Sequence, residues 1–170
     1  MAQNNDAISV FDKHRLAYDM VKAGFRTSIV YIHTQLSKIL LRKLYKTLHN
    51  KSPSSGLLPS SAYVLSNRKN QIYATLFMRI YSKLHKDIEN SIDVKLVMDS
   101  WDIYKLLVPQ CSNEALDIHP RTINEAWALT RDFRASTNYF ANCRQCNQHY
   151  LACDDSRLAK KCPFCNAGNR

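Results

Sequence analysis

Four cysteines near the end of the chain have the types and spacing of a metal site. They form two Cys-x-x-Cys pairs separated by fifteen residues, Cys143 with Cys146 and Cys162 with Cys165. Two thiolates placed two residues apart can wrap one side of a tetrahedral ion, and two such pairs complete the four-sulfur shell of a structural zinc site. Because four sulfurs leave no open coordination position, we expect one structural Zn²⁺ and no catalysis at the metal.

The residues around these pairs favour zinc over other uses of the thiols. Residues 162–168 include turn formers that let backbone amides point at the sulfurs, as in zinc-ribbon knuckles. Disulfides need an oxidising compartment, but residues 1–14 lack the apolar core of a signal peptide and no apolar run is long enough to span a membrane. A redox dithiol beside a βαβ unit also fits poorly. Cys153 and His149 are alternative ligands, although an ordinary thiol and imidazole are simpler, and Cys111 has no assigned role.

Charge is distributed unevenly along the chain. The net charge is +10 and the pI is about 9.4, yet no carboxylate lies between Asp19 and Asp87. The basic residues of that span are Lys22, Arg26, Lys38, Arg42, Lys43, Lys46, Lys51, Arg68, Lys69, Arg79, Lys83 and Lys86. Such a surface suits a polyanion, because carboxylates would repel phosphates. We expect nucleic acid rather than a membrane surface, with a merely solvated basic face as the alternative.

Helical periodicity organises the first fifty residues. It predicts a helix over residues 7–23 that is ended by Gly24. The residues that we place on one side of this helix are Ile8, Phe11, Tyr18 and Val21. A short apolar segment follows from Thr27, and a second helix is expected from its cap at Ser37 to His49. Two helices, a short polar turn and a basic second helix match a helix-turn-helix, whose second helix enters the major groove of DNA.

One face of this second helix carries only positive charge. From Lys38 to His49 the basic residues recur mostly at four-residue spacing, at which like charges destabilise a helix by a few tenths of a kcal/mol (about 0.2–0.5) per pair. An anionic partner explains such a face better than chance does. The DNA contacts that we predict are Lys38 and Arg42 at base edges, and Lys43, Lys46 and Lys51 at phosphates.

Beyond residue 50 the sequence predicts a linker and further helices. We divide the chain into N-terminal helices (1–50), a linker (51–59), a helical domain (60–138) and a four-cysteine module (139–170), so the fold class is mainly α. One helix begins at Ser60 or Ser61, the next spans about Ile92 to Val108, and a third opens at Pro120. The side chains that we place on their inner faces are Ile72, Leu76, Phe77, Ile80 and Leu84; Val94, Val97, Met98, Trp101 and Tyr104; and Ile123, Trp127, Leu129 and Phe133.

Catalytic motifs do not occur in the sequence. It has no Gly-rich phosphate loop, no Gly-x-Ser-x-Gly elbow and no His-Glu-x-x-His pattern. The six histidines are scattered, and the cysteine pairs leave no open metal position. We therefore expect a binding protein and not an enzyme.

Several short motifs, in their order along the chain, resemble one known family. They are Thr34-Gln35-Leu36-Ser37, Leu44-Tyr45-Lys46, Gly56-Leu57-Leu58-Pro59 and Ala126-Trp127-Ala128-Leu129-Thr130-Arg131. With the four cysteines, the chain from about Asp12 to Cys165 resembles the flagellar transcriptional activator FlhC family. The resemblance implies a mostly helical subunit with a zinc site that assembles with the small helical partner FlhD, binds double-stranded DNA upstream of promoters and helps to recruit RNA polymerase.

The resemblance leaves the target genes open. They are flagellar genes or, as in relatives carried by conjugative elements, transfer genes. We assign the acidic region 87–125 to the partner or to RNA polymerase, and we expect a cytoplasmic protein with no membrane association. An RNA-binding zinc-ribbon protein is the alternative of another class, and it would prefer RNA to duplex DNA and need no protein partner.

Overall fold

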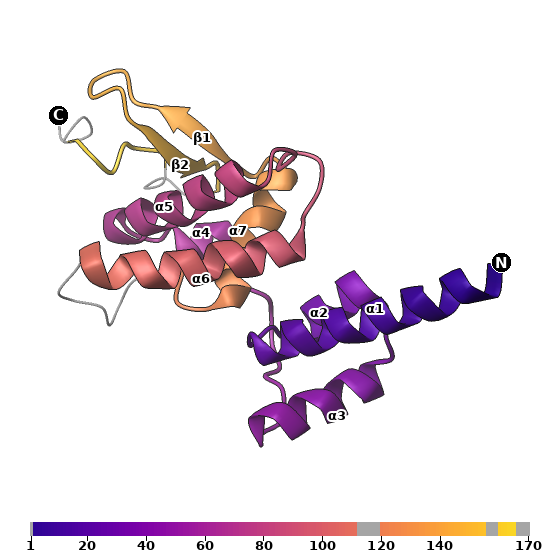
Figure 1. The fold of residues 1–170 in the computed structure, drawn as a ribbon. Helices are drawn as coiled ribbons and strands as arrows, with labels where there is room; N and C mark the ends of the chain where they lie inside the picture. The colour runs from indigo at the N-terminus through magenta and orange to yellow at the C-terminus, as the bar shows by residue number, and fades with distance from the viewer. Residues whose placement is uncertain (1, 112–119, 156–159, 166–170) are drawn as a thin grey trace. The chain divides into compact units, whose positions relative to one another are not determined.

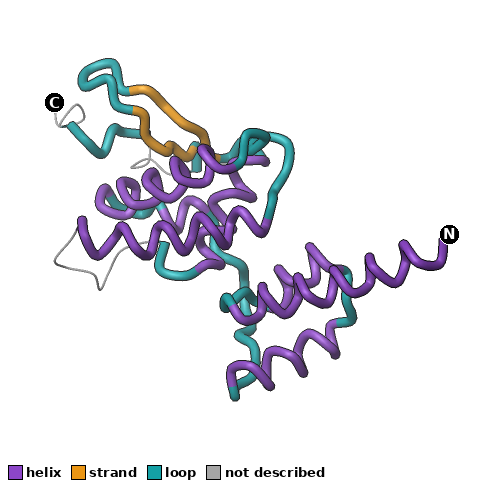
Figure 2. The backbone as a smooth tube through the Cα atoms, viewed as in Figure 1, coloured by secondary structure: helices purple, strands orange, loops and turns teal. Residues whose placement is uncertain are grey.

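The computed structural model describes residues 2–111, 120–155 and 160–165, and these form two compact units (Figure 1). The units comprise residues 1–57 and 58–170, and each is described by itself. Within the described ranges the chain forms seven helices and one two-stranded sheet (Figure 2), which confirms the mainly α fold class. None of these helices is long and apolar enough to cross a membrane. The separate four-cysteine module at 139–170 stays a prediction.

The first unit consists of three helices whose ends follow local sequence signals. They are α1 (Ala2–Lys22), α2 (Thr27–Thr34) and α3 (Lys38–His49). Gly24, with a φ of +93°, ends α1 in a Schellman motif, in which the amide of Phe25 donates to the carbonyl of Met20 at 3.1 Å. Ser37 caps α3, because its hydroxyl accepts a hydrogen bond from the amide of Leu40 at 3.2 Å. Both of these ends were predicted.

Of the α1 residues whose side chains are described, 9–22, buried core residues occur only from Ala17 on, and the predicted Ile8 lies outside the described side chains. The side chains that are fully buried here are Met20, Val21, Phe25, Ile29, Val30 and Leu41. Phe11 and Tyr18 were predicted to share one face of the helix with Val21, but they are 65% and 43% exposed, whereas Val21 is buried. Residues 9–15 are all exposed, and burial on α1 begins at Ala17. Periodicity identified the helix but could not show where its neighbours end.

The second unit is arranged around α5. Its elements are α4 (Ser61–Val64), α5 (Arg68–Leu84), α6 (Val94–Cys111), α7 (Ile123–Arg134), β1 (Asn138–Asn142) and β2 (His149–Cys153). Helix α5 contacts α4, α6, α7 and β2, and Figure 1 shows the hairpin on one side of α5 and α6 on another. The strands are antiparallel, with Asn138 opposite Cys153 and Asn142 opposite His149.

The buried face of α5 differs from the predicted one. The helix predicted from Ser60 or Ser61 is interrupted between α4 and α5. There the side chain of Asn67 caps α5 by accepting a hydrogen bond from the amide of Asn70 at 2.9 Å. The buried residues of α5 are Asn70, Gln71, Tyr73, Ala74, Thr75, Phe77, Met78 and Tyr81. Of the predicted inner face only Phe77 is buried, and Leu84 is exposed. The prediction failed because it used apolar residues alone, whereas polar side chains of α5 point inward to hydrogen-bond partners.

The predicted inner faces of α6 and α7 are buried except at Met98, which is half-buried. Trp101 and Tyr104 of α6 are buried, and their ring centroids lie 6.4 and 5.9 Å from that of Phe77 in edge-on arrangements. This aromatic stripe is therefore core, as its spacing indicated. Helix α7 begins after Thr122, whose hydroxyl accepts from the amide of Glu125 at 3.3 Å, so Pro120 lies ahead of the cap instead of inside the first turn.

A buried carboxylate in α7 ties the second unit together. Asp132 accepts from the amide of Ser61 at 2.8 Å and from Nε of Arg131 at 2.7 Å. Arg131 also donates to the carbonyl of Pro59 at 3.0 Å. The side-chain amide of Asn138, the first residue of β1, donates to the hydroxyl of Ser61. These bonds fix the point at which the hairpin leaves the helices.

Replacing this carboxylate should destabilise the second unit. We expect Asp132→Ala to lower the free energy of unfolding by about 2–3 kcal/mol, because charge-assisted hydrogen bonds are lost and a buried amide is left without a partner. Urea denaturation of the purified chain measures this value. The control is Asp102→Ala, which removes an exposed ion pair to Lys105 and should cost less than about 1 kcal/mol. Equal losses in the two variants would contradict the role of Asp132.

Candidate metal centre and basic helix

The hairpin positions the first cysteine pair. The loop 143–148 joins β1 to β2 and carries Cys143 and Cys146. The amide of Cys143 donates to the carbonyl of Gln148 at 3.0 Å, and the amide of Asn147 donates back to the carbonyl of Cys143 at 2.8 Å. Asn147 has a φ of +56°, a left-handed conformation that Asn tolerates better than most residues. The tight loop therefore holds both sulfurs at the end of the hairpin.

The described segment 160–165 brings the second pair to the first. The amide of Phe164 points at the sulfur of Cys162, at 3.4 Å, as the turn-forming residues predicted. The hydroxyl of Tyr150, from β2, donates to the carbonyl of Lys160 at 3.0 Å. The second pair is thus anchored to the strand that follows the first pair.

All four sulfurs lie within 4.8 Å of one another. The sulfurs of Cys143 and Cys165 are 3.5 Å apart, and those of Cys146 and Cys162 are 3.6 Å apart. A tetrahedral ion with metal–sulfur bonds of about 2.3 Å needs sulfur separations of roughly 3.8 Å. The cluster therefore fits a four-coordinate metal ion. In the described part of the chain no other group of three or more His, Cys, Asp or Glu residues is arranged in this way.

The cysteine thiols differ in how readily they lose a proton. The backbone amides of Cys146 and Gln145 lower the pKa of Cys143 to about 6. At Cys146 the amide of Gln148 favours the thiolate, but burial and the neighbouring sulfurs outweigh it and raise the pKa to about 12. One thiolate therefore forms easily and opposes the ionisation of the next. A divalent cation removes this opposition, because its charge offsets that of the thiolates.

The remaining thiol and imidazole near the pairs lie outside the cluster. Cys153 is buried at the far end of β2, and burial raises its pKa. His149 is exposed at the start of β2 and is not among the grouped ligand atoms. Both placements agree with the simpler of the two interpretations from the sequence. Cys111 is the last residue of α6, and its side chain lies outside the described residues.

The predicted DNA-contact residues lie on α3 or just after it. Lys38, Arg42, Lys43, Lys46 and Lys51 are all exposed. Among the residues described, none of these five side chains pairs with a carboxylate. The ammonium group of Lys38 lies 5.1 Å from the centroid of the Tyr31 ring in α2, a cation–π contact. A set of cations without counter-charges produces the positive potential that attracts an anion.

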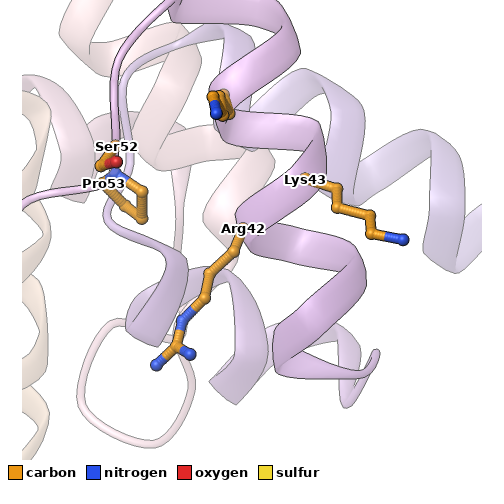
Figure 3. Close-up of a pocket in the computed structure, with 5 residues that line it drawn as sticks. Arg42, Lys43, Ser52 and Pro53 are labelled. Atoms are coloured by element: carbon orange, nitrogen blue, oxygen red, sulfur yellow. The ribbon is translucent and has the colours of Figure 1, made fainter.

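Three of these cations border a hollow of about 420 Å³ beside α3. Arg42, Lys43 and Lys46 come from the helix, and Ser52 and Pro53 form the facing wall. Figure 3 shows the Arg42 side chain extending on the side of α3 where Ser52 and Pro53 lie, whereas Lys43 extends from the other side. The hollow therefore has a guanidinium group and a hydroxyl at its edge and no carboxylate among its lining residues.

His49 departs from the outward stripe that its spacing predicted. Its Nε2 lies 2.7 Å from the carbonyl oxygen of Val21, and its ring centroid lies 4.5 Å from that of Tyr45. The side chain is half-buried. His49 therefore joins the end of α3 to the end of α1 and is not part of the basic face.

Few local patterns in the sequence indicated the residues that support the two sites. Ser52 and Pro53 belong to the stretch that composition assigned to a linker. On α5, the polar side chains Arg68, Gln71 and Thr75 hydrogen-bond to the hairpin and to the second cysteine pair. The available signal was a row of polar residues, three and four positions apart, on an otherwise apolar helix. A core prediction that considers only apolar residues misses these polar side chains.

The fold and the site together define a mainly helical protein with a helix-turn-helix-like unit and a four-cysteine cluster that can hold a metal ion. The family model described as "Flagellar transcriptional activator (FlhC)" matches residues 3–170. The chain therefore belongs to the FlhC family of flagellar transcriptional regulators, and the resemblance seen in its motifs is confirmed.

Individual relatives support the same assignment. A flagellar transcriptional regulator FlhC of Gallionella capsiferriformans is 30% identical over 137 residues, which cover 81% of this chain and 73% of that protein. The regulator of the same name from Pectobacterium carotovorum is also 30% identical, over 81% of this chain and 68% of its own length. That from Thauera aminoaromatica is 26% identical over 99% of this chain and 84% of its own length.

Removing one sulfur should release the metal from the cluster. We expect Cys143→Ser to bind much less metal and to become protease-sensitive after residue 138, because metal binding and folding are coupled in such sites. Metal analysis and limited proteolysis of the purified chain measure the two effects. Cys153→Ala is the matched control, since it removes a buried thiol outside the cluster and should keep its metal. Full metal content and unchanged protease resistance in Cys143→Ser would refute the site.

Proposed function

We propose that this chain is the DNA-binding subunit of a transcriptional activator and that one Zn²⁺ holds its four-cysteine cluster. The carboxylate-free basic surface of α3 carries the DNA-binding part of this proposal. Membership of the FlhC family supports a role in regulating flagellar genes. The same membership, in a family of regulators, is consistent with a protein that is not an enzyme.

Helices α2 and α3 support docking in a DNA groove. The turn between them is residues 35–37, and Gln35 adopts a left-handed φ of +57° that lets α3 start in a new direction. A three-residue turn followed by a basic helix is the arrangement of a helix-turn-helix, in which the second helix enters the major groove. In this proposal Lys38, near the start of α3, reaches base edges.

The hollow beside α3 supports a seat for a backbone phosphate. Arg42 and Lys46 lie one helical turn apart, and the Ser52 hydroxyl adds a donor on the opposite wall. Guanidinium, ammonium and hydroxyl groups are the common partners of DNA phosphates. This arrangement favours a phosphate contact for Arg42 over the base-edge contact that its position in the helix predicted. Lys43 and Lys51 are proposed as further phosphate contacts.

Zinc is the proposed metal because of its chemistry with four thiolates. Soft sulfur ligands select zinc over magnesium, calcium and manganese, and a tetrahedral shell is the preferred geometry of zinc. Cys143, Cys146, Cys162 and Cys165 would hold the ion. When bound, it would contribute folding free energy and leave no open position for a substrate.

The exposed segment 9–15 of α1 supports a protein partner. Residues 9–15 are all exposed and include Val10 and Phe11, which are apolar. Most helical stability in proteins comes from packing of an apolar face, so a helical partner of the FlhD type would stabilise this segment. The acidic region 87–125 is proposed as a second contact, for the partner or for RNA polymerase; residues 112–119 lie outside the described part. A cytoplasmic location, where the DNA lies, belongs to this proposal.

Chromatin immunoprecipitation tests the function in the native host. With the tagged chain and its FlhD-type partner present, we expect discrete peaks upstream of promoters, and we expect them to disappear when the partner gene is deleted. The neighbouring genes then distinguish flagellar targets from conjugative transfer genes. Diffuse signal that is unaffected by the partner, together with co-purified RNA, would overturn the activator in favour of the RNA-binding alternative.

The phosphate seat is tested by DNA binding of the assembled complex in vitro. We expect Arg42→Ala to weaken binding to specific and unrelated duplexes equally and to reduce the slope of log K against log salt by about one. By contrast, Lys38→Ala should weaken only specific binding, by about 1–3 kcal/mol. Lys83→Ala, which removes an exposed charge from α5, is the matched control. A loss confined to the specific duplex in Arg42→Ala would assign Arg42 to a base edge.

A further inference from the structure

Side chains of helix α5 hydrogen-bond to the edge of β2 that faces away from β1. Within the described residues β2 pairs only with β1, and both backbone groups of Leu151 point away from that partner. Nε2 of Gln71 donates to the carbonyl of Leu151, and the amide of Leu151 donates to the hydroxyl of Thr75, both at 2.9 Å. Gln71 and Thr75 are buried. Because buried backbone groups need partners, these two side chains take the place of a third strand.

The first residue of α5 holds the second cysteine pair. Nε of Arg68 donates to the carbonyl of Pro163 at 2.5 Å. Pro163 lies between Cys162 and Cys165, so this bond fixes the backbone that carries both sulfurs. Four thiolates around a divalent ion carry a net charge of about −2, and a guanidinium group beside this segment offsets part of it.

These contacts form one row on the helix. Arg68, Gln71 and Thr75 follow at positions i, i+3 and i+7, which places them on the same face of α5. Another side of the helix carries Phe77, which packs against Trp101 of α6. A change at the cysteine cluster therefore has a continuous path of hydrogen bonds and packing into the helical core.

We propose that Arg68 is a positioning residue of the metal centre and that, with Gln71 and Thr75, it couples metal binding to the order of α5. The proposal rests on metal binding by the four cysteines, as proposed above. With the ion bound, the second pair is fixed and offers its carbonyl to Arg68. Without the ion, nothing holds the two cysteine pairs together, this carbonyl moves away, and the first turns of α5 lose their partners.

Zinc affinity of the full-length chain tests the role of Arg68. The protein is loaded with Zn²⁺ and titrated with a chromogenic chelator. We expect Arg68→Gln to bind zinc about 10–100-fold more weakly, the usual effect of removing a residue that supports metal ligands. Arg79→Gln is the matched control, because Arg79 is an exposed arginine on the same helix, and it should bind zinc as the wild type does. Wild-type affinity in Arg68→Gln would overturn the proposal.

Two further measurements separate positioning from general stabilisation. With Co²⁺ in place of Zn²⁺, Arg68→Gln should change the visible absorption bands that report the geometry of the sulfur ligands, while the metal-free variant and the metal-free wild type should unfold at the same urea concentration. Unchanged cobalt bands, or a metal-free variant as destabilised as the loaded one, would assign Arg68 a purely structural role and overturn the proposal.

Hydrogen exchange tests the coupling in the other direction. On removal of zinc from the wild-type chain, amides in residues 68–77 should exchange at least about tenfold faster, while those of α3 in the first unit should not change. Unchanged exchange in residues 68–77 would overturn the coupling. A wild-type chain that binds no zinc would instead refute the metal site itself, and neither result bears on DNA binding through α3.

Discussion

The convergence of four cysteine sulfurs is the constraint around which the hairpin and the second cysteine pair are arranged. The sulfurs lie within 4.8 Å of one another, and backbone amides lower the pKa of Cys143 while burial and the other sulfurs raise the pKa of Cys146. A bound divalent cation would stabilise the four thiolates, and its binding free energy would then contribute to folding. The hairpin, the second cysteine pair and the polar row on α5 are held around the same point. In the coupling that we propose, the helices that pack on α5 depend indirectly on the cluster.

The first unit, by contrast, exposes positive charge on its surface. Its cations stay exposed on and after α3, and no carboxylate neutralises them in the part of the chain that the structure describes. Such a surface destabilises its own helix slightly and gains from an anionic partner. The chain thus combines a cysteine cluster that can hold a cation with a basic surface that we propose for DNA, in a member of the FlhC family of transcriptional regulators.

The accuracy of the sequence predictions varied from element to element for physical reasons. The inner faces of α6 and α7 were predicted correctly because buried aromatic and aliphatic side chains dominate them. The predicted buried face of α5 was wrong because Gln71 and Thr75 are buried and hydrogen-bond to Leu151 of β2, a contact that no local pattern reveals. On α1, Phe11 has helical spacing but no neighbouring helix to cover it. A pattern predicts which side of a helix is apolar, whereas burial needs a second element.

The sequence by itself determined the features that depend on local chemistry. These include the helix ends at Gly24 and Ser37, the carboxylate-free basic span and the two Cys-x-x-Cys pairs. The two-residue spacing within each pair allows both of its thiolates to bind one ion. Only the tertiary structure decided which distant groups meet: the bond from Gln71 to Leu151 across eighty residues, and the bond from Arg68 to Pro163 across ninety-five residues. Such contacts depend on how helices and loops pack over long sequence separations, and residue spacing along the chain carries no record of that packing.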